Sequence, residues 1–163
     1  AEASEKIDAD IIVNLQGDEP MLNPNEIKLA IDAKQKYPDY VINCASPLHS
    51  SEEPENRNVI KMVMGLNDNL ICASRNPIPV EKSGNAPICK KQVCIYVYNK
   101  EELRLFGKQG TTPLEDVEEV DILRFLEMEV PVKIISVSGD SHAVDVPGDI
   151  EIVENLLREK DSE

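Results

Sequence analysis

Aromatic residues are scarce in this sequence, and tryptophan is absent. Only 4% of the 163 residues are Phe, Tyr or Trp, so the core must be built mainly from Ile, Val and Leu side chains. No apolar stretch reaches the length that is needed to span a bilayer. The composition is otherwise that of a globular domain, with 41% hydrophobic and 29% charged residues.

Basic residues are also few. The chain has 17 Lys and Arg against 31 Asp and Glu, which gives a net charge of −14. This balance argues against non-specific binding to nucleic acid and against docking on an anionic membrane, because both require a basic surface. An anionic ligand is not excluded, since one Arg and a divalent metal ion can reverse the local field.

The four cysteines, at positions 44, 72, 89 and 94, form no C-x-x-C pair, and the two histidines lie apart from them in sequence. A zinc site is therefore not expected. Cys44 and Cys72 stand in apolar runs, and we interpret them as buried, reduced thiols. Reduced thiols are typical of a cytoplasmic protein.

Hydrophobic periodicity and turn signals predict the secondary structure. Strands are expected at 10–16, 40–48, 58–66, 69–75, 91–99 and 130–138, and helices at 23–38, 100–110, 111–129 and 146–160. The run 10–16 is nearly continuously apolar, as in a strand buried on both faces. The pair 58–66 and 69–75 is joined by "NDN", which predicts a hairpin.

The segment 111–129 gives the clearest helix signal. Thr112 and Glu115 form a capping box, and an apolar stripe follows at helical spacing. The order of the elements indicates an α/β layer fold with a parallel core and an inserted antiparallel portion. We expect one domain over residues 1–163, with 76–110 as a loop followed by an inserted strand and helix.

The sequence "VNLQGDEP", residues 13–20, places two carboxylates directly after a predicted strand. In open α/β sheets, ligands bind beyond the carboxyl ends of the strands. Gly17 permits a tight turn, and Asp18 is then expected to point into the crevice. The alternative is an ordinary turn with solvated acidic side chains.

A second acidic strand end occurs in "AVDVPGD", residues 143–149. Asp149 lies in the first turn of the predicted terminal helix, and we interpret it as a helix-capping residue. Asp145 could cap the same helix or bind a metal ion. Two carboxylates on neighbouring strand ends suffice for Mg²⁺, which keeps several waters or phosphate oxygens as ligands.

The motifs "VNLQGDEP", "CASRNPIP", "CIYVYNKEEL", "TPLEDVEEVDILRFLE" and "AVDVPGDIEIV" occur in the order typical of one family. Over residues 5 to 157 the chain resembles the 3-deoxy-manno-octulosonate (Kdo) cytidylyltransferases. The resemblance implies a Rossmann-like nucleotidyltransferase fold, a three-layer sandwich with a mixed, mostly parallel sheet. It implies transfer of CMP from CTP to an acidic sugar in lipopolysaccharide or surface-glycan synthesis, and a homodimer.

The resemblance also implies roles for individual residues. Asp18 and Asp145 correspond to the carboxylates that bind Mg²⁺ in the family. Gln16 and Arg75 correspond to residues of the sugar pocket, and the guanidinium of Arg75 offers a planar fork for the sugar carboxylate. For Arg75 the alternative is a surface Arg at a strand end.

Three further residues are expected in the sugar pocket from the same resemblance. Tyr96 faces that pocket in the family, although packing in the core or in a dimer is an alternative. Asp121 stands where the family has Glu, and Gln92 stands where it has His. The neighbouring Ile122 replaces Gln and cannot donate a hydrogen bond, so a sugar acid other than Kdo stays open.

The resemblance leaves one part of the family unmatched. Its N-terminal strand and basic loop, which bind the CTP triphosphate, have no counterpart in this chain, so we expect an N-terminally truncated domain that could be inactive alone. Alternatives are CTP-dependent activation of another sugar acid or phosphonate, and a non-catalytic remnant that forms oligomer contacts. A hydrolase built on His49 or His142 is disfavoured, because no nucleophile motif accompanies them.

Overall fold

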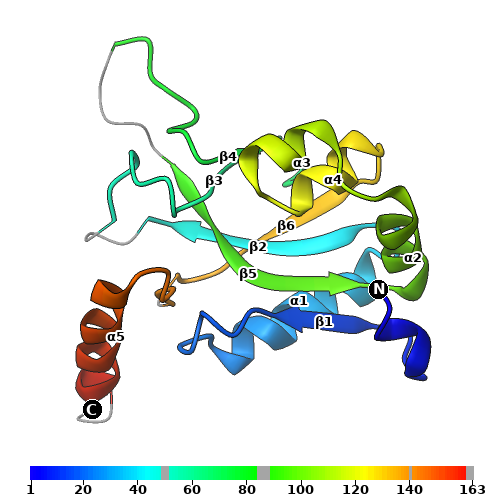
Figure 1. Ribbon diagram of the computed structural model, residues 1–163, viewed down its shortest axis with the longest axis horizontal. Coiled ribbons are helices and arrows are strands. Elements are labelled where there is room, and N and C mark those ends of the chain that lie inside the picture. The colour runs from blue at the N-terminus through cyan, green and yellow to red at the C-terminus, as the bar shows by residue number, and fades with distance from the viewer. Residues whose placement is uncertain (49–51, 84–88, 140, 161–163) are drawn as a thin grey trace.

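The computed structural model describes residues 1–48, 52–83, 89–139 and 141–160. Figure 1 shows a twisted sheet with helices around it. Within the described residues, no helix has the length and apolar character that a membrane crossing requires. The elements, in chain order, are η1 (Ser4–Lys6), β1 (Ile12–Leu15), α1 (Pro24–Lys36), β2 (Val41–Pro47), β3 (Lys61–Met64), β4 (Leu70–Ser74), β5 (Lys90–Tyr98), α2 (Lys100–Gln109), α3 (Pro113–Glu118), α4 (Ile122–Glu127), β6 (Val132–Ser136) and α5 (Pro147–Lys160).

The sheet has the strand order β4-β3-β5-β2-β6, with β1 paired to β5 as well. The predicted α/β class and mixed sheet are confirmed. The expectation of mostly parallel strands is wrong for the described residues, where β2 and β6 form the one parallel pair and every other pairing is antiparallel. The sequence marks strands by their composition, but it does not show the direction in which each strand enters the sheet.

Strand β1 differs from its prediction in burial. It pairs with β5 only, so Ile12 and Val13 are half-buried, whereas Asn14 and Leu15 are exposed.

The predicted hairpin is confirmed, because β3 and β4 pair antiparallel across a turn in which Asp68 adopts a positive φ of 56°. Cys44 is buried as expected, but Cys72 is exposed on β4.

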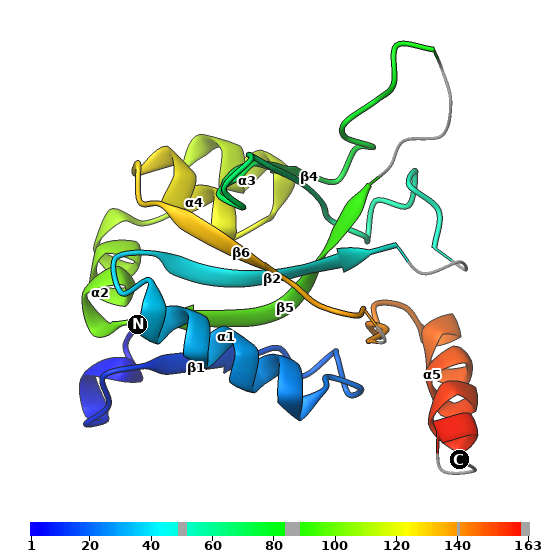
Figure 2. The ribbon, with the colours of Figure 1, turned by 180° about the vertical axis from the view of Figure 1, so that it is seen from behind.

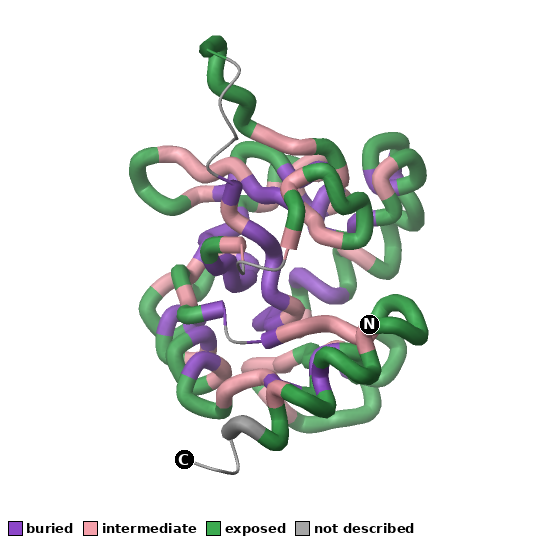
Figure 3. The backbone as a smooth tube through the Cα atoms, turned by 90° about the vertical axis from the view of Figure 1, so that its left-hand side faces the viewer, coloured by how far each residue is buried: buried purple, intermediate pink, exposed green. Residues whose placement is uncertain are grey.

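Two hydrophobic cores cover the two faces of the sheet. Figure 2 shows α1 lying along one face, and there Ala30 and Ala33 pack against Ile42, Val93 and other strand residues. On the other face, side chains of α2 and α4 pack against the sheet, including its strands β3 and β4. The result is a three-layer arrangement. Figure 3 shows that the buried segments, drawn in purple, lie mainly in the interior of the molecule.

The predicted single helix at 111–129 is wrong, because the structure has two short helices, α3 and α4. Glu119 adopts a left-handed conformation with φ 52° and ψ 50°, which ends α3. The guanidinium of Arg75 donates hydrogen bonds to carbonyls that this break leaves without helical partners. Its Nε donates to Glu118 O at 2.5 Å, and its Nη2 donates to Glu119 O at 3.0 Å.

The break also divides the predicted apolar stripe. Val120 and Leu123 are 2% exposed and belong to the core. Leu114 and Val117 on α3 are 54% and 80% exposed, so they do not take part in it. Residues that a continuous helix would align on one face therefore lie in different surroundings.

Candidate functional site

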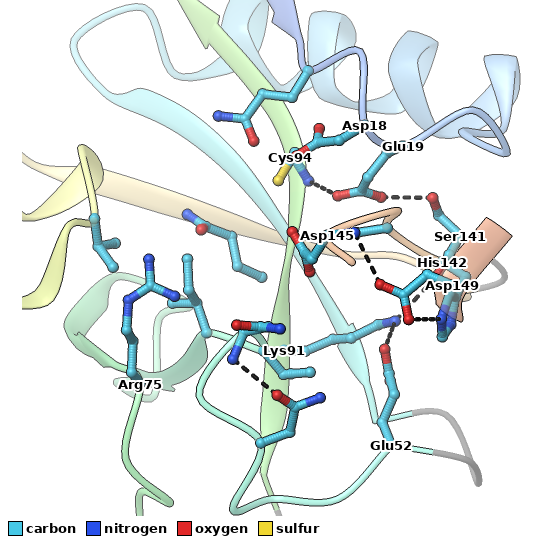
Figure 4. A pocket seen from close by; sticks show the side chains of 18 of the residues that line it. Asp18, Glu19, Glu52, Arg75, Lys91, Cys94, Ser141, His142, Asp145 and Asp149 are labelled. Atoms are coloured by element: carbon cyan, nitrogen blue, oxygen red, sulfur yellow. Dashed lines mark hydrogen bonds and ion pairs between the residues drawn. The ribbon is translucent and has the colours of Figure 1, made fainter. Parts of the chain in front are cut away.

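The pocket forms beside the middle of β5, where its neighbouring strands leave a gap. β3 pairs with the start of β5, ending with Lys61 opposite Lys91, and β1 pairs with its later part, ending with Leu15 opposite Ile95. The segment of β5 between these pairings is the floor of a pocket of about 570 Å³ (Figure 4). The loop before α5, the loop before β3 and the break between α3 and α4 supply the other walls.

The predicted site residues all lie in the wall of this pocket. They come from the loop after β1, from the position directly after β4, from β5, from the α3–α4 break and from the loop before α5. They are Gln16, Asp18, Arg75, Gln92, Tyr96, Asp121 and Asp145. The structure thus brings together residues that are far apart in sequence, while their individual roles stay predictions.

Asp18 and Asp145 come from two neighbouring loops that are joined by a main-chain hydrogen bond. The N–H of Val144 donates to the carbonyl of Asp18 at 2.8 Å. Figure 4 shows both carboxyl groups on the same side of the pocket. Desolvation raises the pKa of Asp145, and the negative charges of Asp18 and Asp149 raise it further. A cation bound between the two carboxyls would relieve this repulsion.

The loop before α5 is held in place by two features. Gly139 adopts a φ of +85°, and a Cβ atom there would lie 2.5 Å from the Cβ of Ser46, so only glycine fits. Asp149 closes the start of α5 by accepting from the N–H groups of Asp145 and Val146, each at 2.9 Å. The predicted capping role of Asp149 is confirmed, and the carboxyl of Asp145 is left to face the pocket.

Glu19 is a functional candidate that the sequence did not single out. It is 8% exposed, and its carboxylate joins three elements. Oε1 accepts from the N–H of Cys94 on β5 at 2.7 Å, and Oε2 accepts from the hydroxyl of Ser141 at 2.6 Å. Glu19 therefore fixes the loop of Asp18 against the sheet and against the loop of Asp145.

Arg75 is anchored to the pocket wall by main-chain carbonyls. Besides its bonds to the α3–α4 break, its Nη1 donates to Arg57 O at 2.8 Å. Among the described residues, these contacts occupy three of the five N–H groups of the guanidinium, which leaves two for a ligand. The side chain is thereby held at a fixed position, where it can present a planar fork to an anion.

Lys91 is a second cation in the pocket wall, and the sequence did not point to it. Its Nζ lies 2.6 Å from Glu52 Oε1 and donates to Ser141 O at 3.1 Å. Both side chains of the pair are almost fully buried, at 7% and 8% exposed. No local sequence pattern indicates this ion pair, because Glu52 lies 39 residues from Lys91 in sequence.

Tyr96 packs in the core and also lines the pocket, while its expected role toward the sugar stays a prediction. It is 4% exposed and stacks on Tyr98 with 6.1 Å between the ring centroids, yet it also contributes to the pocket wall. Burial raises the pKa of its hydroxyl, so this group stays protonated.

The other two positions of the expected sugar pocket differ in their surroundings. Desolvation raises the pKa of the Asp121 carboxyl, and the charge of Glu115 raises it further. Ile122 is fully buried in the core and does not face the pocket.

The described residues contain no group of three or more His, Cys, Asp or Glu side chains arranged to hold a metal ion. The pair Asp18 and Asp145 nevertheless fits Mg²⁺, which prefers oxygen ligands and takes few protein carboxylates. His142 lies 4.0 Å from Asp149, and the hydroxyl of Ser141 donates to Glu19, so this hydroxyl is not directed at the neighbouring His. His49 lies outside the described residues.

Comparison with known proteins gives consistent results. Residues 1–134 match the family described as cytidylyltransferase. The chain is 34% identical to the 3-deoxy-manno-octulosonate cytidylyltransferase of Myxococcus xanthus, over 93% of this chain and 61% of that protein. It is 33% identical to the mitochondrial enzyme of the same name from Arabidopsis thaliana, over 98% of this chain and 57% of the relative. The chain thus spans about six-tenths of their length.

The solved structures agree with the sequence relatives. A structure of CMP:2-keto-3-deoxy-manno-octonic acid synthetase complexed with CTP superposes with a TM-score of 0.87 and 25% identity, over 98% of this chain and 66% of that one. The inositol-1-phosphate CTP transferase of T. maritima superposes with a TM-score of 0.64 at 14% identity, which shows a shared fold alone.

Proposed function

The chain belongs to the cytidylyltransferase family, and from this premise we propose that its pocket serves cytidylyl transfer from CTP to an acidic sugar of the Kdo type. The observation that carries the proposal is the convergence of two acidic loops and an anchored arginine on one pocket. Its products would be a CMP-sugar and pyrophosphate. A cytoplasmic, homodimeric enzyme is part of the same proposal.

In this reaction the anomeric hydroxyl of the sugar acid attacks the α-phosphorus of CTP. The new bond joins that oxygen to phosphorus, the bond to the β-phosphate oxygen breaks, pyrophosphate leaves, and the hydroxyl proton passes to water. Asp18 and Asp145 would hold Mg²⁺, which when bound offsets phosphate charge and favours ionisation of the attacking hydroxyl. Arg75 would bind the sugar carboxylate, and Glu19 would keep the two acidic loops in register.

Most of the catalytic effect would come from positioning and charge stabilisation. Both substrates are anionic and the whole chain is acidic, so they repel one another and the protein. Arg75 supplies positive charge in the pocket wall, whereas the charge of Lys91 is balanced by its ion pair with Glu52. Phosphoryl-type transfers need little covalent participation from the protein once the reactants are aligned.

A second candidate within the same class is the activation of another sugar acid. The substitution of Gln92 for His supports it, because Gln92 lies in the pocket wall. The substitution at Ile122 does not, since this side chain is fully buried in the core. A non-catalytic remnant is the alternative outside the class, and it predicts no binding of Mg²⁺-CTP.

The test is pyrophosphate release from CTP and Mg²⁺ with a panel of sugar acids that includes Kdo. It is run on this chain and on a chain extended upstream in its reading frame. We expect release with at least one acid, and a fall of about 100-fold or more for Asp145→Asn because a ligand of the metal is lost. Asp39→Asn, an exposed acid outside the pocket, should retain the rate. The proposal would be refuted if neither form of the chain released pyrophosphate with any of the acids.

A further inference from the structure

Lys61, the first residue of β3, carries a fully buried ammonium group. The residue is 0% exposed. Its Nζ donates to the carbonyls of Asn56 at 2.8 Å, Val59 at 2.6 Å and Arg75. An ammonium group has three N–H donors, so main-chain carbonyls use all of them. Burying a charge costs free energy, and a well-packed apolar side chain often stabilises a fold as well or better. The ammonium at this position therefore requires an explanation beyond packing.

The three residues whose carbonyls Lys61 binds all line the pocket. Asn56 and Val59 come from the loop before β3, and Arg75 directly follows β4. The loop and Arg75 are joined a second time, because Arg75 Nη1 donates to the carbonyl of Arg57 at 2.8 Å. Arg57 lies in the loop between the two residues that Lys61 binds. Lys61 thus fixes both the main chain of Arg75 and the loop that receives its guanidinium.

Glu118 holds the main chain of Arg75 through its N–H group. One carboxylate oxygen, Oε2, accepts from the N–H of Arg75 at 2.8 Å, and Oε1 accepts from the hydroxyl of Ser74 at 2.7 Å. The N–H and the carbonyl of Arg75 are therefore each bound by a charged side chain. A residue that is held in this way loses little conformational freedom when it binds an anion, which is the energetic advantage of a preorganised site.

We propose that Lys61 is a positioning residue for the carboxylate of the acidic sugar, because it holds Arg75 in the orientation that receives this group. The inference rests on the proposed function, in which Arg75 binds the carboxylate. Lys61 itself does not touch the ligand, since its three N–H groups are used and it has no exposed surface. Without the ammonium, the carbonyl of Arg75 and the loop that anchors Nη1 would lose their common partner. Binding of the carboxylate would then weaken more than binding of the rest of the sugar.

The test compares Lys61→Met, which is close to Lys in length but carries no charge, with Lys34→Met. Lys34 is the matched control, because it is a buried Lys, 2% exposed, on α1 and outside the pocket wall. The first readout is hydrogen exchange at Nε–H of Arg75, followed by NMR in the full chain without ligand. In Lys61→Met it should be faster by about tenfold or more, since the bond to Glu118 O opens more often. Exchange at the wild-type rate in Lys61→Met would overturn the inference, and Lys34→Met should keep that rate.

The second readout is the affinity for Kdo and for an analogue in which the carboxylate is reduced to an alcohol, measured by calorimetry with Mg²⁺. Lys61→Met should bind Kdo about tenfold more weakly and the analogue nearly as the wild type does, because only the carboxylate depends on the fork of Arg75. Lys34→Met should leave the ratio of the two affinities unchanged. Equal losses for both ligands in Lys61→Met would overturn the inference, since a general loosening of the pocket would explain them.

The wild-type chain gives a separate answer if either part of this comparison fails. If no sugar acid binds the wild type, the proposed function fails, and exchange at Arg75 decides alone whether Lys61 positions this residue. If Lys61→Met does not fold, NMR of the Lys61 ammonium in the wild type decides. Slow exchange of its protons and a scalar coupling across the hydrogen bond to the Arg75 carbonyl would support the inference. Exchange as fast as at Lys6, whose side chain is 72% exposed, would overturn it.

Discussion

The carboxyl of Asp145 lies among other carboxyl groups at the end of the loop before α5. Desolvation and the charges of Asp18 and Asp149 raise its pKa, and Arg75 opposes them. A carboxyl with a raised folded-state pKa contributes stability that is fully present below its unfolded pKa and is lost as the pH rises through the folded pKa. At pH 7 the ionised group therefore weakens the metal-free fold.

Asp145→Asn is expected to stabilise the metal-free chain at pH 7 while it weakens Mg²⁺ binding. The gain should stay below about 1 kcal/mol, because the exposed carboxyl is partly screened by water. It should vanish below about pH 4, where the wild-type carboxyl is protonated in both states. Urea unfolding at the two pH values measures the effect. Added Mg²⁺ should raise the midpoint of the wild type more than that of the variant.

Asp39→Asn serves as the control for this prediction, since Asp39 is exposed in a turn away from the pocket. It should change neither the midpoint at pH 7 nor the response to Mg²⁺. Destabilisation by Asp145→Asn at pH 7 without metal would contradict the expectation that the carboxyl groups of the pocket repel one another.

At the scale of residues, the sequence predicted those side chains whose position in a motif indicates their role. Asp18 and Asp145 were found because each follows a strand, and the pocket contains both. Glu19 was not, because its partners Cys94 and Ser141 lie 75 and 122 residues away. A buried carboxylate that joins three segments has no local pattern to mark it.

At the scale of elements, the break between α3 and α4 was the feature that local periodicity concealed. The capping box at Thr112 is present, with its N–H donating to Glu115 Oε2 at 3.1 Å. The end of α3 instead depends on Arg75, which belongs to a distant strand end and binds the carbonyls that the break frees. The directions of the strands were hidden for a similar reason, because pairing is decided between segments far apart in sequence.

The left-handed conformation of Glu119 leads to a prediction for this break. A non-glycine residue in that region lowers the free energy of unfolding by roughly 1 kcal/mol or more. Glycine avoids this steric cost, but it increases the conformational entropy of the unfolded chain. Glu119→Gly should therefore leave the free energy of unfolding unchanged or raise it by up to about 1 kcal/mol. Chemical denaturation followed by circular dichroism provides the measurement.

Lys28→Gly is the matched comparison, since Lys28 is exposed in the ordinary helix α1. There the same substitution to glycine should lower the free energy of unfolding by about 0.5–1 kcal/mol. Equal losses at the two positions would show that the conformation at Glu119 carries no strain.

At the scale of the whole molecule, one buried ion pair connects the layers on opposite faces of the sheet. Lys34 lies on α1 and Glu102 on α2, and their side chains are 2% and 7% exposed. Lys34 Nζ contacts Glu102 Oε1 at 2.6 Å and Oε2 at 2.7 Å, and it donates to Pro38 O at 3.0 Å and Tyr40 O at 2.7 Å. The ammonium group is thus completely surrounded by oxygen acceptors.

Lys34→Met should lower the free energy of unfolding by about 3–5 kcal/mol, because it leaves the carboxylate of Glu102 buried without its counter-charge. The double variant Lys34→Met/Glu102→Leu should recover part of this loss, since no uncompensated charge is then buried. Urea unfolding measures both. Lys6→Met, which breaks the exposed pair with Glu2, should cost at most about 1 kcal/mol. Similar costs for the buried and exposed pairs would mean that the two layers are held together by the sheet alone.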